Sequence, residues 1–100
     1  MCSIFGQINF SDSLCDSKKF INASDTLRHR GPDSRNYLSD EVNYQFAFNR
    51  LAIMDLNRTG SQPMYSQCKR YVCIFNGEIY NYQKIYEEIK DIFKWEGSSD

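Results

Sequence analysis

The most restrictive feature of this sequence is an alternation of side chains that begins at its second residue. The even positions hold Cys2, Ile4, Gly6, Ile8 and Phe10, and the odd ones hold Ser3, Phe5, Gln7 and Asn9. Successive side chains of a strand point to opposite faces, so this period of two predicts a strand over residues 2–10. The alternation returns in residues 44–53, which predicts a second long strand.

A short helix is predicted between these strands, over Asp16–Arg28. Its inward positions recur at helical spacing and are Phe20, Ile21, Ser24 and Leu27. Gly31 can close the helix, and Pro32 prevents its continuation because it cannot adopt the helical hydrogen bonding. A loop is expected to follow.

The C-terminal part of the sequence indicates a hairpin and then a helix. The continuous run Tyr71–Phe75 suits a strand buried on both faces, and Asn76-Gly77 is a strong signal for a tight turn. Glu78–Tyr80 is then expected to return beside that strand. Asn81 can cap a helix with an apolar stripe at helical spacing, which is expected to face the core. The stripe consists of Tyr82, Ile85, Tyr86, Ile89, Ile92 and Phe93.

Strands and helices that alternate along the chain, with antiparallel hairpin signals, predict an α+β fold rather than a doubly wound parallel sheet. A chain of 100 residues is expected to form a single domain. No apolar run approaches the ~20 residues of a membrane-spanning helix. Twelve basic residues balance 13 acidic ones without a basic stripe. We therefore expect neither a membrane nor nucleic acid as partner, and a cytoplasmic location.

Four cysteines and one histidine limit the metal and redox chemistry. The cysteines form no CxxC pair, and a single histidine makes a metal site improbable, so no metal is expected. Reduced thiols are the default in the cytosol. Cys15, Cys68 and Cys73 are interpreted as packing residues. His29 lies just before the Gly31-Pro32 turn, where a structural hydrogen bond is favoured over catalysis.

Cys2 is the first candidate for catalysis. Removal of Met1 would leave a thiol and a free α-amino group on the same carbon, so that the nucleophile and its base share one residue. This arrangement suits attack on an amide carbonyl. The alternative is a small apolar residue at the start of a strand, because free cysteine is among the most buried residue types.

Asn76-Gly77 and Arg50 are candidates for binding a substrate. The asparagine amide and the glycine N–H can together stabilise an oxyanion, although the pair alone equally indicates a simple hairpin turn. Arg50 interrupts an apolar strand and can hold a carboxylate by two hydrogen bonds. It can instead face outward or pair with Asp33 or Asp55. Asp100 can pair with a substrate ammonium if the chain folds back.

Five motifs, in one order, resemble the class II glutamine amidotransferase domain, and the last two sharpen the likeness to glutamine-dependent asparagine synthetases. They are Met1–Gly6, Arg28–Asp33, Arg50–Ile53, Gln62–Met64 and Phe75–Asn81. The resemblance implies an N-terminal nucleophile hydrolase fold, an α/β/β/α sandwich of two facing antiparallel sheets. It covers all 100 residues but only about the first half of such a domain, so the sandwich is expected to be incomplete.

The resemblance also implies a role for each candidate residue. Cys2 would attack the side-chain amide of glutamine, and Asn76 and Gly77 would hold the oxyanion. The implied glutamine-binding positions are Arg50 for the α-carboxylate, the strand backbone of Leu51, Ala52, Ile53 and Met54, and Glu78 and Asp100 for the amino end. Ser3 is a departure, because the family usually has glycine there, and its side chain is expected to crowd the packing or alter how Cys2 is presented.

By the same resemblance, the released ammonia passes to a synthetase domain or subunit that amidates aspartate with ATP and Mg. No pyrophosphate loop or Walker A sequence occurs here, so residues 1–100 are expected to be the N-terminal part of an amidotransferase domain without a cofactor or synthetase domain of their own. Open sheet edges favour association, for example as a homodimer. Two alternatives stay open: a sugar or another ammonia acceptor, or a truncated glutamine-binding remnant without turnover.

Overall fold

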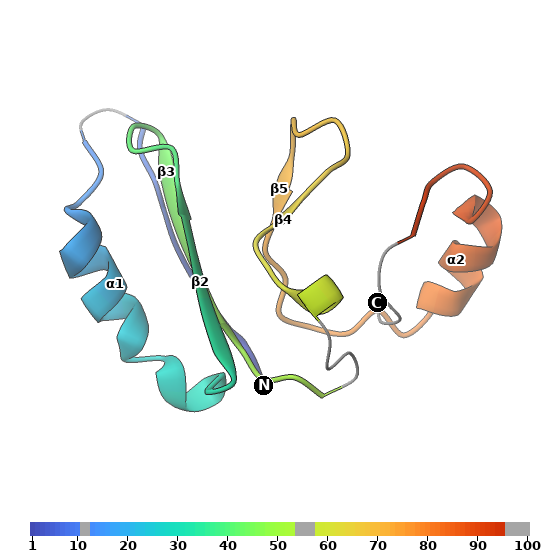
Figure 1. Cartoon of the computed structure of the whole chain (residues 1–100), viewed down its shortest axis with the longest axis horizontal. Coiled ribbons are helices and arrows are strands. Elements are labelled where there is room, and N and C mark those ends of the chain that lie inside the picture. The colour runs from blue at the N-terminus through green and yellow to red at the C-terminus, as the bar shows by residue number, and fades with distance from the viewer. Residues whose placement is uncertain (11–12, 54–57, 96–100) are drawn as a thin grey trace.

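The N-terminal half of the chain is an antiparallel sheet covered on one face by a helix (Figure 1). The computed structural model describes residues 1–10, 13–53 and 58–95. Its three-stranded sheet has the order β1-β3-β2. The elements in chain order are β1 (Ser3–Ile8), α1 (Ser17–Asp25), the 3-10 turn η1 (Arg28–Arg30), β2 (Ser34–Ser39), β3 (Tyr44–Arg50), the 3-10 turn η2 (Arg58–Gly60), β4 (Met64–Tyr65), β5 (Val72–Cys73) and α2 (Tyr82–Ile89).

The two strands predicted from the period of two are β1 and β3, and they pair with each other. Ser3 lies opposite Asn49, and Ile8 lies opposite Tyr44. The alternation therefore located both strands, although β3 ends at Arg50 and does not continue through residue 53 as predicted. One set of alternate side chains faces α1, and the other faces away from it.

The helix α1 confirms the helix predicted between the strands, although it ends at Asp25, before the predicted end at Arg28, and Gly31 instead follows the 3-10 turn η1. The Asp16 carboxylate accepts hydrogen bonds from the N–H groups of Lys18 and Lys19, at 3.1 and 3.2 Å, and so satisfies two free donors at the helix start. Phe20 is 2% exposed, and its ring lies 4.9 Å from the ring of Phe5 and 5.8 Å from that of Tyr37. This aromatic cluster fastens α1 to the sheet.

The loop predicted after Pro32 is wrong, because residues 34–39 form the strand β2, which pairs with β3. Its sequence mixes polar and apolar residues on both faces and so lacks a clear alternation. Side-chain contacts fix it instead: Arg35 forms an ion pair with Asp25 of α1, and the Tyr37 hydroxyl donates to Oε1 of Gln45 at 3.0 Å. Tertiary partners therefore override weak local preference here.

The C-terminal half departs furthest from the sequence predictions. Only Val72–Cys73 of the predicted buried strand is extended, and it pairs with the preceding β4 rather than with Glu78–Tyr80. The predicted hairpin at Asn76-Gly77 is therefore wrong. The helix α2 starts after Asn81 as predicted, but the Asn81 side chain makes no capping hydrogen bond.

The apolar stripe of α2 does not face a core. Ile85 and Tyr86 are each 38% exposed, and no residue from 59 to 95 is buried. Figure 1 shows the reason, because α2 lies apart from the three-stranded sheet. Helices and antiparallel sheets together confirm the predicted α+β class. No helix in the described part of the chain is long and apolar enough to cross a membrane.

Candidate active site

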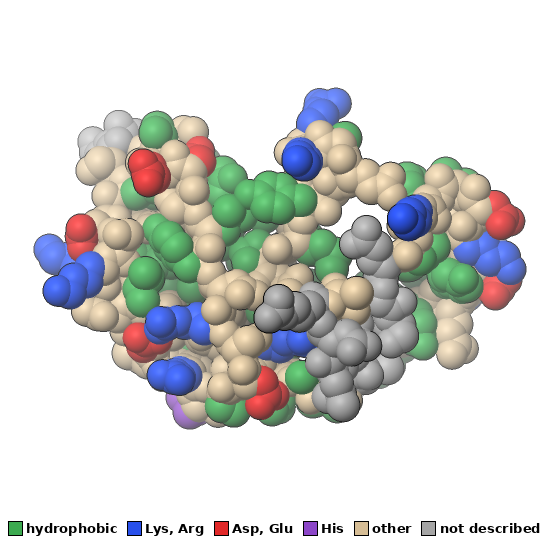
Figure 2. Space-filling view, viewed as in Figure 1, with side chains coloured by type: hydrophobic (Ala, Val, Ile, Leu, Met, Phe, Trp, Pro, Cys, Tyr) green, Lys and Arg blue, Asp and Glu red, His purple; other side chains and the backbone are tan. Residues whose placement is uncertain are grey.

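A cavity of about 1150 Å³ lies beside the face of the sheet that α1 leaves open. The segment from η2 to the end of the described chain forms its other wall, and hydrophobic side chains gather between the sheet and the β4–β5 hairpin (Figure 2). The predicted site residues that line this cavity are Cys2, Arg50, Leu51, Ala52, Ile53, Asn76, Gly77 and Glu78. Met54 and Asp100, also predicted to bind substrate, lie outside the described residues.

Cys2 immediately precedes β1, and its half-buried side chain lines the cavity. Its thiol donates to the carbonyl oxygen of Leu51 at 3.5 Å, and the N–H of Leu51 donates to the sulfur at 3.3 Å. Leu51 can make both contacts because β3 ends at Arg50 and leaves its backbone outside the strand pairing. These bonds fix the sulfur beside the residues predicted to bind substrate.

The Arg28–Asp33 motif shapes the end of β3 and so positions this part of the site. A Cβ on Gly31 would lie 2.2 Å from the Asn49 carbonyl oxygen, so only glycine allows the two backbones to come this close. The N–H of Asp33 donates to the Arg50 carbonyl at 3.0 Å. The Asp33 carboxylate accepts from the N–H of Ala52 at 2.7 Å. The motif therefore serves as a scaffold for residues 50–52.

His29 has the structural role predicted for it. Its Nδ1 lies 3.1 Å from the Thr26 carbonyl oxygen, to which it donates, and this bond closes the turn after α1. The side chain is exposed and does not line the cavity. Its geometry therefore matches a turn residue rather than a general base.

Asn76 and Gly77 reach the cavity from an irregular segment that follows β5. Gln62 connects this segment to the sheet: its backbone oxygen accepts from the Asn36 side chain of β2 at 2.7 Å, and its side-chain oxygen accepts from the Phe75 N–H. The bond to Phe75 replaces the ladder hydrogen bond that the predicted hairpin would have made. Gln62 belongs to one of the five sequence motifs, but no pattern in the sequence indicates this bridging role.

Opposite charges face the cavity from its two walls. Arg50, half-buried, belongs to the sheet, and Glu78, exposed, belongs to the C-terminal half. This arrangement fits a small zwitterion with a carboxylate and an ammonium group. Lys94 also lines the cavity and was not predicted, because it follows α2 without any motif around it.

The cavity has an aromatic wall, and two of its members, Phe75 and Phe93, were predicted from the sequence to lie in a core. Phe75, Tyr80, Phe93 and Trp95 line it, and the ring of Trp95 stands edge-on to that of Tyr86 at 5.0 Å. The helical period of the α2 stripe indicates an apolar face, but the period alone does not show whether that face packs in a core or lines a cavity.

The other three cysteines were interpreted as packing residues, and this was wrong. Cys15, Cys68 and Cys73 are exposed, and all four cysteines are free. Cys68 lines the cavity, and a hydrogen bond of 3.3 Å with the Ser66 hydroxyl lowers the pKa of its thiol below the usual value, with the Arg70 N–H acting in the same direction. Among the described residues, no three His, Cys, Asp or Glu side chains are grouped to hold a metal ion.

The chain is similar to a glutamine amidotransferase family and to several known proteins. The family model described as a glutamine amidotransferase domain matches residues 1–100. Asparagine synthetase B (glutamine-hydrolyzing) of Escherichia coli is 44% identical over 102 residues, which cover 100% of this chain and 18% of that protein. Asparagine synthetase (glutamine-hydrolyzing) 1 of Bacillus subtilis is 39% identical, over 90% of this chain and 14% of that protein. Amidase chry2 of Gibberella zeae is 36% identical, over 85% of this chain and 13% of its own length. The chain thus spans less than a fifth of the length of these relatives.

Proposed function

The chain belongs to the glutamine amidotransferase domain family, and from that premise we propose that it releases ammonia from glutamine for the synthesis of asparagine. One observation carries the proposal: Cys2, Arg50 and Asn76-Gly77, far apart in sequence, all line one cavity. The names of two relatives, both glutamine-hydrolysing asparagine synthetases, support the choice of glutamine as donor and aspartate as acceptor.

Glutamine binding uses the charges on the two walls. The Arg50 guanidinium binds the α-carboxylate, and Glu78 binds the α-ammonium. The backbone of Leu51–Ile53 lies along the substrate, and the family resemblance assigns Met54 and Asp100 to glutamine binding as well. This orientation directs the side-chain amide of glutamine toward the sulfur of Cys2.

The reaction proceeds through a thioester. After removal of Met1, the α-amino group of Cys2 takes the thiol proton and the sulfur attacks the amide carbon, forming the C–S bond. The Asn76 amide and the Gly77 N–H donate to the oxyanion of the tetrahedral intermediate. The C–N bond then breaks, and ammonia leaves with the proton held by the α-amino group. Water hydrolyses the thioester, releasing glutamate and restoring the thiol.

The face of the sheet beside the cavity gives the architecture that we propose for the whole enzyme. Ile4 and Ile8 are 43% and 55% exposed on this face. A second antiparallel sheet covers such a face in an α/β/β/α sandwich. In this proposal, residues 1–100 are the N-terminal part of the amidotransferase domain, and a synthetase domain or subunit uses ATP and Mg to amidate aspartate in the cytoplasm.

An electrophilic glutamine analogue tests the function. Intact mass after incubation should show a chain without Met1 that carries one analogue, and peptide mapping should place it on Cys2. The Cys2→Ala variant should remain unlabelled and release no glutamate. The Cys68→Ala variant is the matched control, because that thiol lines the same cavity yet should be dispensable. Labelling that follows Cys68, or a Cys2→Ala variant that still releases glutamate, would contradict the proposal.

A further inference from the structure

Two pairs of polar side chains connect β1 to β3 on the face that α1 covers, one at each end of the strand pair. Ser3 lies opposite Asn49, and Gln7 lies opposite Gln45. Nδ2 of Asn49 donates to Oγ of Ser3 at 3.0 Å, and Nε2 of Gln45 donates to Oε1 of Gln7 at 2.7 Å. The pairs have similar chemistry, but only the Ser3–Asn49 pair adjoins residues that line the cavity.

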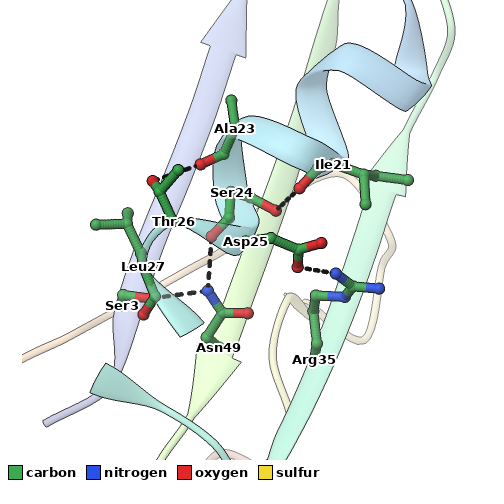
Figure 3. Close-up of polar contacts among 9 residues, drawn as sticks. All are labelled: Ser3, Ile21, Ala23, Ser24, Asp25, Thr26, Leu27, Arg35 and Asn49. Carbon is green, nitrogen blue, oxygen red and sulfur yellow. Dashed lines mark hydrogen bonds and ion pairs between the residues drawn. The ribbon is translucent and has the colours of Figure 1, made fainter. Parts of the chain in front are cut away.

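The Ser3–Asn49 pair is buried, and each of its two side chains makes one further hydrogen bond to a backbone carbonyl (Figure 3). The Ser3 hydroxyl donates to the carbonyl of Leu27 at 3.3 Å, and the Asn49 amide also donates to the carbonyl of Ser24 at 3.2 Å. Ser3 is 4% exposed and Asn49 is 1% exposed, so water does not compete for these bonds. The Ser3 hydroxyl thus has hydrogen-bond partners on both sides, which accommodate a side chain that was expected to crowd this position.

This anchoring acts on the two backbone segments that meet at the thiol. Cys2 directly precedes Ser3, and Arg50 and Leu51 directly follow Asn49. The sulfur of Cys2 contacts both the N–H and the carbonyl of Leu51. Because neighbouring residues are joined by planar peptide units, fixing Ser3 against Asn49 limits how the thiol can move relative to Leu51 and Arg50.

Asn49 also carries a feature that packing alone does not require. Its Oδ1 is buried and has no hydrogen-bond partner in the described part of the chain. A buried oxygen without a partner is unfavourable, whereas an apolar side chain of similar volume would avoid that cost. The retained amide is thus better explained by its two donated bonds than by filling of the space beneath α1.

We infer that Ser3 and Asn49 are positioning residues for Cys2: their buried hydrogen bond holds the nucleophile in register with the substrate-binding end of β3. The inference rests on the proposed function of Cys2. Neither side chain touches substrate, and both act through the backbone. Small displacements of a nucleophile slow the reaction strongly, while substrate binding at Arg50 is preserved.

Inactivation by the electrophilic glutamine analogue separates positioning from stability in the full chain. Ser3→Ala and Asn49→Ala should each lower the maximal inactivation rate about ten-fold and leave the half-saturating concentration within about two-fold. The matched variants Gln7→Ala and Gln45→Ala break the equivalent bond at the other end and should leave both constants within about two-fold. Ser3→Thr keeps the hydroxyl and should recover most of the rate. Urea unfolding of each variant gives the stability loss for comparison.

Three results decide the inference. Equal inactivation rates for the Ser3 and Gln7 variants, at equal stability, would overturn the positioning role and leave the proposed function intact. No labelling of the wild-type chain would overturn the proposed function and the inference with it. If an alanine variant fails to unfold cooperatively, the deciding variant is Asn49→Leu, which keeps the side-chain volume and removes both donated hydrogen bonds. The same ten-fold loss of the inactivation rate would support the inference, and a wild-type rate would overturn it.

Discussion

The two halves of this chain differ in how they bury their side chains, and the candidate site is divided between them. Among the residues that the structure describes, the buried side chains all lie between Ser3 and Asn49, and no residue from 59 to 95 is buried. Cys2 and Arg50 belong to the half that has a core. Asn76, Gly77 and Glu78 belong to the half without one. The proposed nucleophile is thus held by packed structure, and the proposed oxyanion donors are held by a few specific contacts.

This difference indicates where the site can change shape most easily. The segment that carries Asn76-Gly77 is tied to the sheet through Gln62, by one bond to Asn36 and one to the Phe75 N–H. The eight-residue helix α2 is too short to be stable without tertiary packing. Segments with few buried contacts open at low free energy. We therefore expect local opening to separate the oxyanion donors from Cys2 well before the sheet unfolds.

The largest predicted effect is the loss of the aromatic cluster in the N-terminal half. Phe20→Ala removes a ring that is 2% exposed and packs against Phe5 and Tyr37. Loss of a buried phenylalanine side chain lowers the free energy of unfolding by about 3–5 kcal/mol. Urea denaturation, monitored by circular dichroism, measures this loss. If the variant is already unfolded without urea, the loss is at least as large as the free energy of unfolding of the wild type.

Tyr86→Ala provides the comparison from the other half. Tyr86 is also an aromatic residue on a helix, but it is 38% exposed and pairs with Trp95 alone among the ring contacts of the described residues. An aromatic pair contributes about 0.5–1.5 kcal/mol beyond the area that it buries, and this ring is only partly buried, so the free energy of unfolding should fall by less than in Phe20→Ala. Equal losses for Phe20→Ala and Tyr86→Ala would remove the distinction between the halves.

An effect smaller than that of Phe20→Ala is expected at the turn that supports the end of β3. In Gly31→Ala, the new Cβ would lie 2.2 Å from the Asn49 carbonyl oxygen, which is backbone and cannot rotate away. Overpacking of this kind costs about 1–3 kcal/mol of stability, and the shift of Arg50 should also weaken glutamine binding. Unfolding in urea and the KM for glutamine measure the two effects.

Gly6→Ala is the matched control for the turn variant. Its Cβ would meet the ring of Phe46 at 2.8 Å, and that side chain can move aside. We expect a smaller loss of stability than in Gly31→Ala and no change in the KM for glutamine. A Gly31→Ala variant with unchanged stability and KM would show that the close approach at Asn49 does not support the site.

The N-terminal half was predicted more accurately than the C-terminal half, although β2 was missed and the start of α2 was predicted correctly. Strands β1 and β3 and helix α1 were found because each has a buried face, so that periodicity records burial directly. In the C-terminal half, the same reasoning placed the α2 stripe in a core and Asn76-Gly77 in a hairpin, and both predictions were wrong. Ile89 and Phe93 of the stripe line a cavity together with Asn76 and Gly77, and β5 pairs with β4 instead.

Most of the predicted site residues line one cavity, although their roles stay predictions. Cys2, Arg50 and Asn76-Gly77 were selected for their chemistry, which does not depend on the secondary structure that carries them. The bridge at Gln62 and the pair Ser3–Asn49 were not predicted, because both depend on contacts between segments far apart in sequence. Local patterns contain no record of such long-range hydrogen bonds.

The smallest predicted effect is a pH dependence at the turn between β2 and β3. The Asp40 carboxylate accepts from the N–H groups of Tyr44, Asn43 and Val42, and these bonds hold its pKa well below the usual range, the bond from Tyr44 most strongly. Since the unfolded chain binds this proton more readily, the contribution is complete above the unfolded pKa of about 4 and declines as the pH falls toward the folded value. Asp40→Asn keeps an acceptor for these N–H groups but cannot titrate. Its urea midpoint should therefore fall less than that of the wild type between pH 7 and about pH 3. Parallel losses in the two proteins would show that acid weakens this half through other groups.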